Sequence, residues 1–380
     1  MKKVLATILA LVMALSVTTM AWADDVAKID GTGYATLQEA VNAANNGQTI
    51  VLQSDVVLTA SLNVAAGKTV TLDLNSCKIT ADMNGPHMIC NAGNLTITDS
   101  SENKTGEIAK IGAETNFGYV IENHGTMTLD RCKISSTSVK SSAIENGWYT
   151  ASANTAGTSC TMTIQNAEVV SVNAAGGLYT VKNDDYGVMV INGGVFTNGV
   201  AGAGAVLNWN DLTINGGTFT GASAVRTLKS GSSDFETGKS QIKNGTFNGG
   251  IDTLDGYKTG ITIAVTGGTF STDVTEYLAE GKILQKNGDT YTAVTNSGIT
   301  SGTYTAKPTV PDGYKVVENT DGTFTVEKVG GYYYYQPTTD TKTTDTKGSP
   351  KTFDAGIALY VGMALTSAAG VAFVGKKRED

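Results

Sequence analysis

Short stretches in which apolar and polar residues alternate recur along this 380-residue chain. One of them, LTINGGTF, starts at Leu212, breaks at two glycines and resumes with Thr-Phe. Alternation with a period of two is typical of a half-buried strand, and glycine allows a corner that a bulkier residue would obstruct. Because repetition about every 20 to 40 residues indicates a solenoid or an array, the pattern predicts stacked coils of short strands.

Three columns of equivalent residues emerge when these stretches are aligned. The first column is apolar and consists of Leu74, Ile97, Leu129, Ile164, Ile191, Ile214, Ile242 and Val265. The second, five residues further on, consists of Ile79, Ile134, Val169, Phe196, Phe219, Phe247 and Phe270. The third precedes the first and consists of Asn91, Asn123, Asn146, Asn183 and Asn208. Stacked asparagines can pass side-chain hydrogen bonds from coil to coil, so the third column predicts a buried ladder.

Three strand segments per coil, inward apolar columns and an asparagine ladder resemble the right-handed parallel β-helix of the pectin-lyase-like group. The resemblance covers residues 29–270 and implies an all-β solenoid. An antiparallel sandwich or barrel is the alternative fold. It would need hairpin signals at even spacing, and the aligned columns do not provide them.

Both ends of the expected solenoid carry segments that would cover the outermost coils. At the N-terminal end, Thr36 and Glu39 form the pattern of a capping box. The helically spaced apolar residues that follow it predict a short capping helix, and they are Leu37, Ala40, Val41 and Ala44. After Phe270, two similar segments place Asn/Asp/Gly turns between alternating strands, which predicts β-hairpins. This C-terminal arrangement resembles that of many adhesin-like surface proteins of gut Firmicutes.

The two chain ends indicate export and anchoring. Two lysines, an apolar run and Ala21-Trp22-Ala23, which has the small-x-small pattern of a signal-peptidase cleavage site, predict a signal peptide over residues 1–23. A short membrane anchor is the alternative. Residues 355–375 carry no charge and are followed by Lys-Lys-Arg. That length predicts a transmembrane helix, and the basic residues place its tail in the cytoplasm.

The motif SPKTF, which starts at Ser349, resembles the cell-wall sorting signals that sortases process in Gram-positive bacteria. Phe353 stands where that family usually has glycine. The resemblance implies Pro350 and Thr352 as sorting residues, with a sortase and peptidoglycan as partners. Membrane retention is the alternative to transfer at Thr352.

The expected segments are the signal peptide (1–23), the capped solenoid (24–270), the capping region with hairpins (271–329), a Thr/Asp/Lys-rich stalk (330–348), and the sorting motif with its membrane span (349–380).

Composition argues against several classes of partner. The net charge is −8. Removal of residues 1–23 and of the segment after Thr352 leaves 22 basic and 32 acidic side chains, about −10 in net charge. An acidic body disfavours nucleic acid and anionic lipid as ligands. The four cysteines show no scaffold or metal-binding spacing, and we expect neither a metal nor a cofactor.

One set of candidate residues stands just before the asparagine column: Cys90, Glu122, Glu145, Lys182, Leu207 and Arg226. Alternation predicts that they face outward. Glu122 and Glu145 would lie on neighbouring coils about 4.8 Å apart, close to the separation of roughly 5 Å in a retaining glycosidase. A solvated ladder of charges that Lys182 balances is the alternative. His87 and His124 are interpreted as isolated turn residues.

The second set of candidate residues follows the asparagine column at the next corner. It consists of His124, Trp148, Tyr149, Asp184, Asp185, Tyr186, Trp209 and Asp211. Aromatic faces pack on the C–H faces of sugars, and carboxylates accept hydrogen bonds from hydroxyl groups. This strip predicts a binding surface for an extended glycan, whereas the alternative is that the aromatics cover a loop.

Three functions remain open on the sequence. The preferred one is a surface-anchored, adhesin-like protein that binds carbohydrate or another surface ligand. The second is a polysaccharide lyase or glycoside hydrolase that uses Glu122 and Glu145. The third is a structural spacer. No enzyme family's catalytic motif is present, so we expect binding rather than catalysis.

Overall fold

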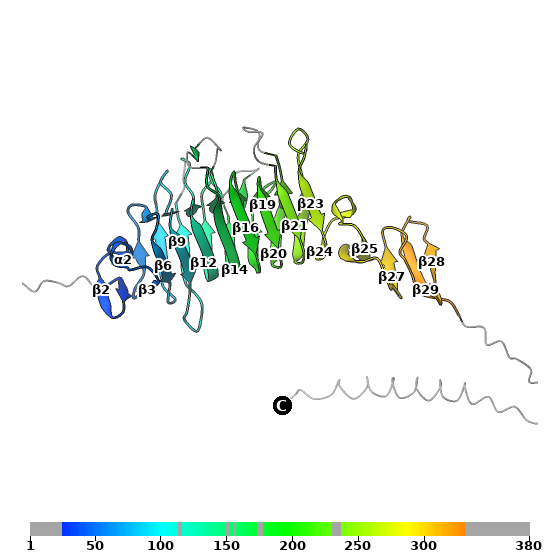
Figure 1. Cartoon of the computed structure of the whole chain (residues 1–380), viewed down its shortest axis with the longest axis horizontal. Coiled ribbons are helices and arrows are strands. Elements are labelled where there is room, and N and C mark those ends of the chain that lie inside the picture. The colour runs from blue at the N-terminus through cyan, green and yellow to red at the C-terminus, as the bar shows by residue number, and fades with distance from the viewer. Residues whose placement is uncertain are drawn as a thin grey trace, which may run out of the picture. The chain divides into compact units, whose positions relative to one another are not determined.

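The computed structural model describes residues 25–112, 116–148, 153–154, 157–172, 178–229 and 237–330. These residues are mostly strands, with one short helix, α2 (Leu37–Ala43), and a 3-10 turn, η2 (Thr275–Tyr277). Most strands pair in parallel with the equivalent strand of the next coil, and Figure 1 shows them as successive rungs. The arrangement is consistent with the predicted β-helix. The expected signal peptide, sorting motif and membrane span, and the expected stalk from residue 331 on, lie outside the described residues.

The first row of stacked strands contains the repeated alternating phrase. Its inward residues pair in register, for example Ile164 with Ile191 and Ile191 with Ile214. The row consists of β3 (Gln48–Leu52), β6 (Thr69–Asp73), β9 (Asn94–Thr98), the first halves of β12 (Thr126–Ser136) and β14 (Cys160–Ser171), β16 (Gly187–Ile191), β19 (Asp211–Ile214), β21 (Lys239–Ile242) and β23 (Thr262–Val265).

The second row buries a stack of aromatic rings. Phe196, Phe219, Phe247 and Phe270 are fully buried, and neighbouring rings lie 4.9 to 5.0 Å apart and nearly parallel. The row consists of β4 (Val56–Val57), β7 (Lys78–Ala81), β10 (Glu107–Lys110), the second halves of β12 and β14, β17 (Gly194–Asn198), the first halves of β20 (Thr218–Thr227) and β22 (Thr246–Asp252), and β24 (Thr269–Phe270).

The third row ends at the asparagine column, and the predicted ladder is confirmed. Each side-chain Nδ2 donates to the Oδ1 of the next asparagine at 2.7 to 2.8 Å, from Asn91 through to Asn208, whose Nδ2 donates to the Ser240 hydroxyl. The row consists of β5 (Leu62–Val64), β8 (Ile89–Asn91), β11 (Ile121–Asn123), β13 (Ile144–Asn146), β15 (Tyr179–Asn183), β18 (Gly204–Asn208) and the second halves of β20 and β22.

Two details of the predicted columns were wrong. Ile97 pairs with Leu72, not with Leu74. The corner after Leu72 is two residues longer than the corner after Leu129, because Ile79 lies seven residues after Leu72 whereas Ile134 lies five after Leu129, and it contains Asn75 and Ser76 at positive φ. The second column also contains Ile108, which pairs with Ile79 and Ile134. It was missed because a loop separates it from its first-row strand.

The predicted helix and two short strands, β1 (Ala27–Ile29) and β2 (Thr32–Tyr34), cover part of the N-terminal end. Thr36 and Glu39 form the capping box of α2, which buries Leu37, Ala40 and Val41. β1 pairs antiparallel with β3 and so covers the edge of the first row. The outer edge of the third row is covered differently, because the Gln38 side chain bonds both the N–H and the C=O of Asn63, at 2.8 and 3.0 Å.

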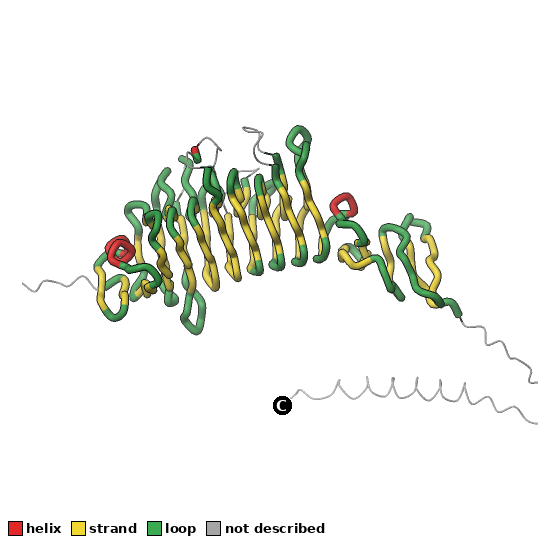
Figure 2. Tube along the Cα trace, viewed as in Figure 1, coloured by secondary structure: helices red, strands yellow, loops and turns green. Residues whose placement is uncertain are grey.

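The C-terminal segment switches from parallel to antiparallel pairing. β24 pairs with β26 (Thr290–Thr295), which forms a hairpin with β25 (Lys282–Asn287). β25 pairs with β27 (Gly302–Tyr304), and β28 (Tyr314–Glu318) forms a second hairpin with β29 (Phe324–Lys328). Both hairpins follow the predicted pattern. Figure 2 shows the loops gathered at the corners between strand rows, where insertions do not disturb the stack.

The ladder gives a stability prediction. Asn183→Ala should lower the free energy of unfolding by about 1 to 3 kcal/mol, because buried polar partners lose their hydrogen bonds. The control is Asn215→Ala. Asn215 also donates to a neighbouring asparagine, Asn192, but that contact is exposed, so its loss should cost under about 0.5 kcal/mol. Urea unfolding of the purified protein measures both, and equal effects would contradict a stabilising ladder.

Candidate functional site

The outward column of the third row runs in register along the stack. Glu122 pairs with Cys90 on one side and with Glu145 on the other, and Glu145 pairs with Lys182. The column continues through Leu207 and Arg226 and extends to Asp252. The predicted sequence of neighbours is therefore present, but the surroundings of its members differ from those expected.

Two histidines flank Glu122, which corrects their interpretation as isolated turn residues. His87 Nε2 lies 3.3 Å and His124 Nε2 lies 3.9 Å from Glu122 Oε1. The Glu122 side chain is 19% exposed, so solvent reaches this carboxylate. The signal for His87 was its position: it stands three residues before Cys90, as Tyr119 stands before Glu122, and the two rings stack at 5.1 Å.

A backbone hydrogen bond selects one tautomer of the neutral His87 ring. The backbone N–H of Tyr119 donates to His87 Nδ1 at 2.9 Å. A nitrogen that accepts a hydrogen bond carries no proton, so neutral His87 carries its proton on Nε2 and presents it to Glu122. The same proton leaves Nε2 without a lone pair for a metal. Among the described residues, no group of three or more His, Cys, Asp or Glu side chains is arranged to hold a metal ion.

The other ionisable groups beside Glu122 are neutral near pH 7. Burial lowers the pKa of His124, although the nearby Glu122 acts in the opposite direction. Burial raises the pKa of the Cys90 thiol to about 11, and Glu122 adds to the rise. Cys90 is therefore a thiol, not a nucleophilic thiolate. The exposed centre of the site is a single carboxylate among neutral hydrogen-bonding groups.

The aromatic residues of the corner strip contact one another. Trp148 stacks on His124 with ring centres 4.4 Å apart, and Tyr186 meets the Trp148 ring edge-on at 6.2 Å. His124, Trp148 and Tyr186 are each half-buried. One face of the indole is covered by His124 and the side chain is half-buried, so Trp148 is not an open platform.

The rest of the strip departs further from the expectation. Asp184 and Asp185 are buried, at 4% and 1% exposure, and do not face the solvent. Trp209 packs on an apolar cluster of Tyr179, Leu207 and Leu228. Asp211 is the first residue of β19 and is half-buried. Tyr149, Pro350 and Thr352 lie outside the described residues.

Glu145 is buried, which contradicts the expected solvated ladder. Its side chain is 2% exposed and accepts a hydrogen bond from the Tyr119 hydroxyl at 2.9 Å. Lys182 Nζ lies 3.8 Å from Glu145 Oε1 and forms an ion pair with Asp184. Glu122 and Glu145 pair in register, but only Glu122 is presented to solvent. The sequence could not show this, because the Tyr119 hydroxyl that contacts Glu145 comes from the neighbouring coil.

The surroundings of Glu145 also favour its protonated form at neutral pH. Burial raises its pKa to about 9; the Lys182 ammonium opposes this rise, and the Asp184 carboxylate adds to it. A protonated carboxyl can donate to Asp184, which already binds Lys182. The result is a closed hydrogen-bonded group on the coil next to the exposed Glu122.

A second cluster on the same row was missed by the sequence. Arg226 forms a two-point ion pair with Asp252, at 2.5 and 2.9 Å, and lies 5.8 Å from the centre of the Tyr179 ring. Asp252 follows Arg226 in the column, so extending the column by one coil would have found it. Because all its charges are paired, this cluster is less suited to a ligand than Glu122.

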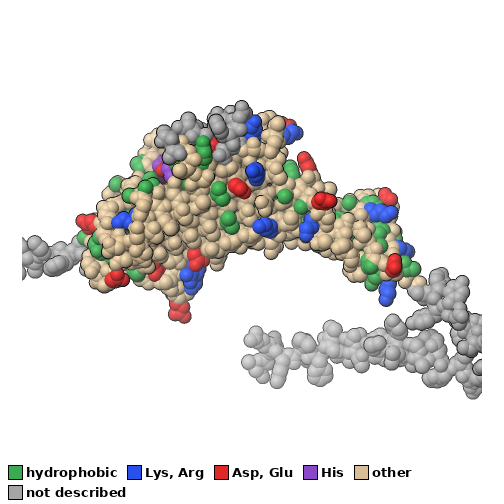
Figure 3. Space-filling view, in the orientation of Figure 1, with side chains coloured by type: hydrophobic (Ala, Val, Ile, Leu, Met, Phe, Trp, Pro, Cys, Tyr) green, Lys and Arg blue, Asp and Glu red, His purple; other side chains and the backbone are tan. Residues whose placement is uncertain are grey.

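Figure 3 shows acidic and basic side chains interspersed on the visible face, without a large patch of one sign.

The sequence matches no protein-family model, and no curated protein or solved structure matches it. No helix among the described residues is long and apolar enough to cross a bilayer. The span expected at residues 355–375 lies outside that part of the chain.

The buried Glu145 predicts a pH dependence of stability. Its pKa is raised on folding, so between about pH 4.5 and 9 the folded state holds a proton that the unfolded state has lost. The contribution of Glu145 to the free energy of unfolding should therefore fall as pH rises across that window, by up to about 1.4 kcal/mol per pH unit. Glu145→Gln should flatten the profile of unfolding free energy against pH. The exposed Glu168→Gln serves as the control, and a profile unchanged by Glu145→Gln would show that Glu145 is ionised.

Proposed function

We propose that this chain is an exported, surface-anchored protein of a Gram-positive bacterium, and that it binds a glycan at the surface around Glu122. Its body is proposed to be a right-handed parallel β-helix of the pectin-lyase-like type. The signal peptide, the sorting-like motif and the membrane span of the sequence support the location. The stacked parallel rows support the architecture.

The observation that carries the binding proposal is the environment of Glu122. The carboxylate is part-exposed, and His87 Nε2 lies 3.3 Å from it in a ring that the Tyr119 N–H holds in place. His124 on the same coil and Trp148 on the next coil continue the surface. Carboxylates and imidazoles exchange hydrogen bonds with sugar hydroxyls, while the Trp148 edge supplies apolar contact. A ligand that crosses successive coils would meet one polar or aromatic group on each.

Binding should depend on the Glu122 charge. Glu122→Gln keeps the shape and an acceptor for His87, but a charge-assisted hydrogen bond is worth about 1.5 to 3 kcal/mol. We expect affinity for a bound glycan to fall about 10- to 100-fold. Trp148→Ala should also weaken binding, and Glu168→Gln should leave it unchanged. Isothermal titration against the glycans selected from an array measures this, and equal affinity in all variants would exclude the Glu122 surface.

Catalysis remains the second candidate for one reason. Glu145, with its raised pKa, lies opposite the exposed Glu122 in register, and two carboxyl groups of different protonation are the basis of acid–base cleavage of glycosides. Because Glu145 is buried beneath Tyr119, substrate contact would require that covering to move. Release of reducing ends from the same glycans, abolished by Glu145→Gln, would favour the enzyme. Neither binding nor release would favour the spacer.

The location has its own test. In a Gram-positive host, the full chain should fractionate with wall or membrane, and deletion of residues 355–380 should release the protein into the medium. The apolar span and its basic end are the retention signal in this proposal. Thr352→Ala separates the two modes of retention: it should abolish covalent linkage to peptidoglycan but leave membrane retention intact. Full-length protein in the cytosol would overturn the proposal.

A further inference from the structure

The N-terminal end of the stack leaves one strand edge uncovered. The first row is covered there by β1, which pairs with β3, and the third by the Gln38 side chain, which bonds Asn63. The second row begins with β4, which pairs with β7 on one side. Within the described residues, no other strand pairs with β4. An unpaired edge presents backbone N–H and C=O groups that can accept another strand.

The free groups of β4 can be identified. The Leu58 N–H donates to the Thr80 carbonyl of β7 at 2.8 Å. Because neighbouring peptide groups of a strand point to opposite edges, the N–H and C=O of Val57 point away from β7. Val57 is also the most exposed large hydrophobic residue of the described chain, at 72%. A strand laid beside β4 would pair with Val57 without displacing any bond to β7.

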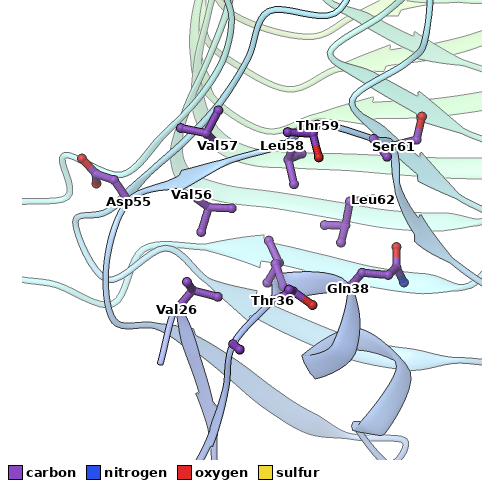
Figure 4. A pocket seen from close by; sticks show the side chains of 13 residues that line it. Val26, Thr36, Gln38, Asp55, Val56, Val57, Leu58, Thr59, Ser61 and Leu62 are labelled. Carbon is purple, nitrogen blue, oxygen red and sulfur yellow. The ribbon is translucent and has the colours of Figure 1, made fainter. Parts of the chain in front are cut away.

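A pocket of about 380 Å³ lies beside this edge. Figure 4 shows it between β4 above and the segment around Val26, Thr36 and Gln38 below, with Val56 and Leu62 pointing into it. The lining is largely apolar because the end of the hydrophobic core opens here. The opening lies between two parts of the chain, so one extended strand fits it better than the edge of a second sheet.

The lining also selects for charge. Asp55 is the one charged residue among those that line the pocket, and it is exposed. One of its oxygens accepts from the Lys78 N–H at 2.8 Å, which fixes the carboxylate at the start of β4. A basic side chain on the incoming segment would complement it, and an acidic one would be repelled.

We propose that β4 and this pocket bind a single extended peptide of a partner protein by strand addition, with a small apolar side chain in the pocket and a basic side chain beside Asp55. The main-chain hydrogen bonds come from Val57, and the pocket and Asp55 provide specificity. This site is separate from the Glu122 surface and does not depend on it. In the surface-anchored protein it would lie at the end farthest along the chain from the anchor.

A random 12-residue peptide library displayed on phage is the probe, with the purified full chain as the target. We expect selected peptides to alternate apolar and polar residues and to share a Lys or Arg at a fixed offset. Val57→Pro removes the N–H that points away from β7, without removing a bond to β7, and proline is tolerated at such an edge. It should reduce peptide affinity at least 10-fold, whereas Val57→Ala, which keeps the N–H, should change it less than 3-fold.

Two further measurements keep the test independent of any misfolding of the proline variant. Asp55→Asn retains the acceptor for Lys78 but loses the charge, and it should weaken only the peptides that carry the basic residue. Bound peptide should also slow hydrogen exchange in the segment that contains Val57. Failure to select any peptide, affinity insensitive to both Val57→Pro and Asp55→Asn, or unchanged exchange in β4 would each overturn the proposal.

Discussion

In-register stacking is the constraint on which the rest of this structure depends. A parallel coil places each side chain directly over its equivalent in the next coil. When a residue type repeats along a column, its side chains must therefore pack favourably against one another. Phenylalanine meets this condition by parallel ring stacking, and asparagine meets it because its amide carries both a donor and an acceptor. Such side chains can repeat along a buried column, whereas a buried column of identical charges could not.

The column through Glu122 shows how charge is accommodated under this constraint. Two glutamates on adjacent coils would repel if both were ionised and buried. The raised pKa of Glu145 favours the neutral form of that carboxyl, and the imidazoles of His87 and His124 flank the other carboxylate. The same stacking that stabilises the fold therefore produces two carboxyl groups of different character within one coil spacing. This contrast makes the site chemically unusual for the surface of a scaffold.

Much of the fold could be predicted from the sequence because stacking forces repetition. The asparagine column, the phenylalanine column, the capping box and the hairpins all follow from residue identity and spacing. Ile108 and the register of Leu72 could not be predicted, since loop and corner lengths vary without a sequence rule. The candidate site was predicted less well. The contacts of Glu145 with Tyr119 and of Glu122 with His87 join corners distant in sequence, and burial there depends on tertiary packing.

The asparagine ladder also has a direction. Every Nδ2 donates toward the C-terminal coils, so the side-chain amide dipoles from Asn91 to Asn208 point the same way along the stack. Hydrogen bonds aligned in this manner polarise one another. A single amide reversed within the row would set donor against donor on one side and acceptor against acceptor on the other. The order of the whole row is therefore fixed collectively. Its last donor, on Asn208, bonds acceptors outside the column of asparagine side chains, among them the Ser240 hydroxyl.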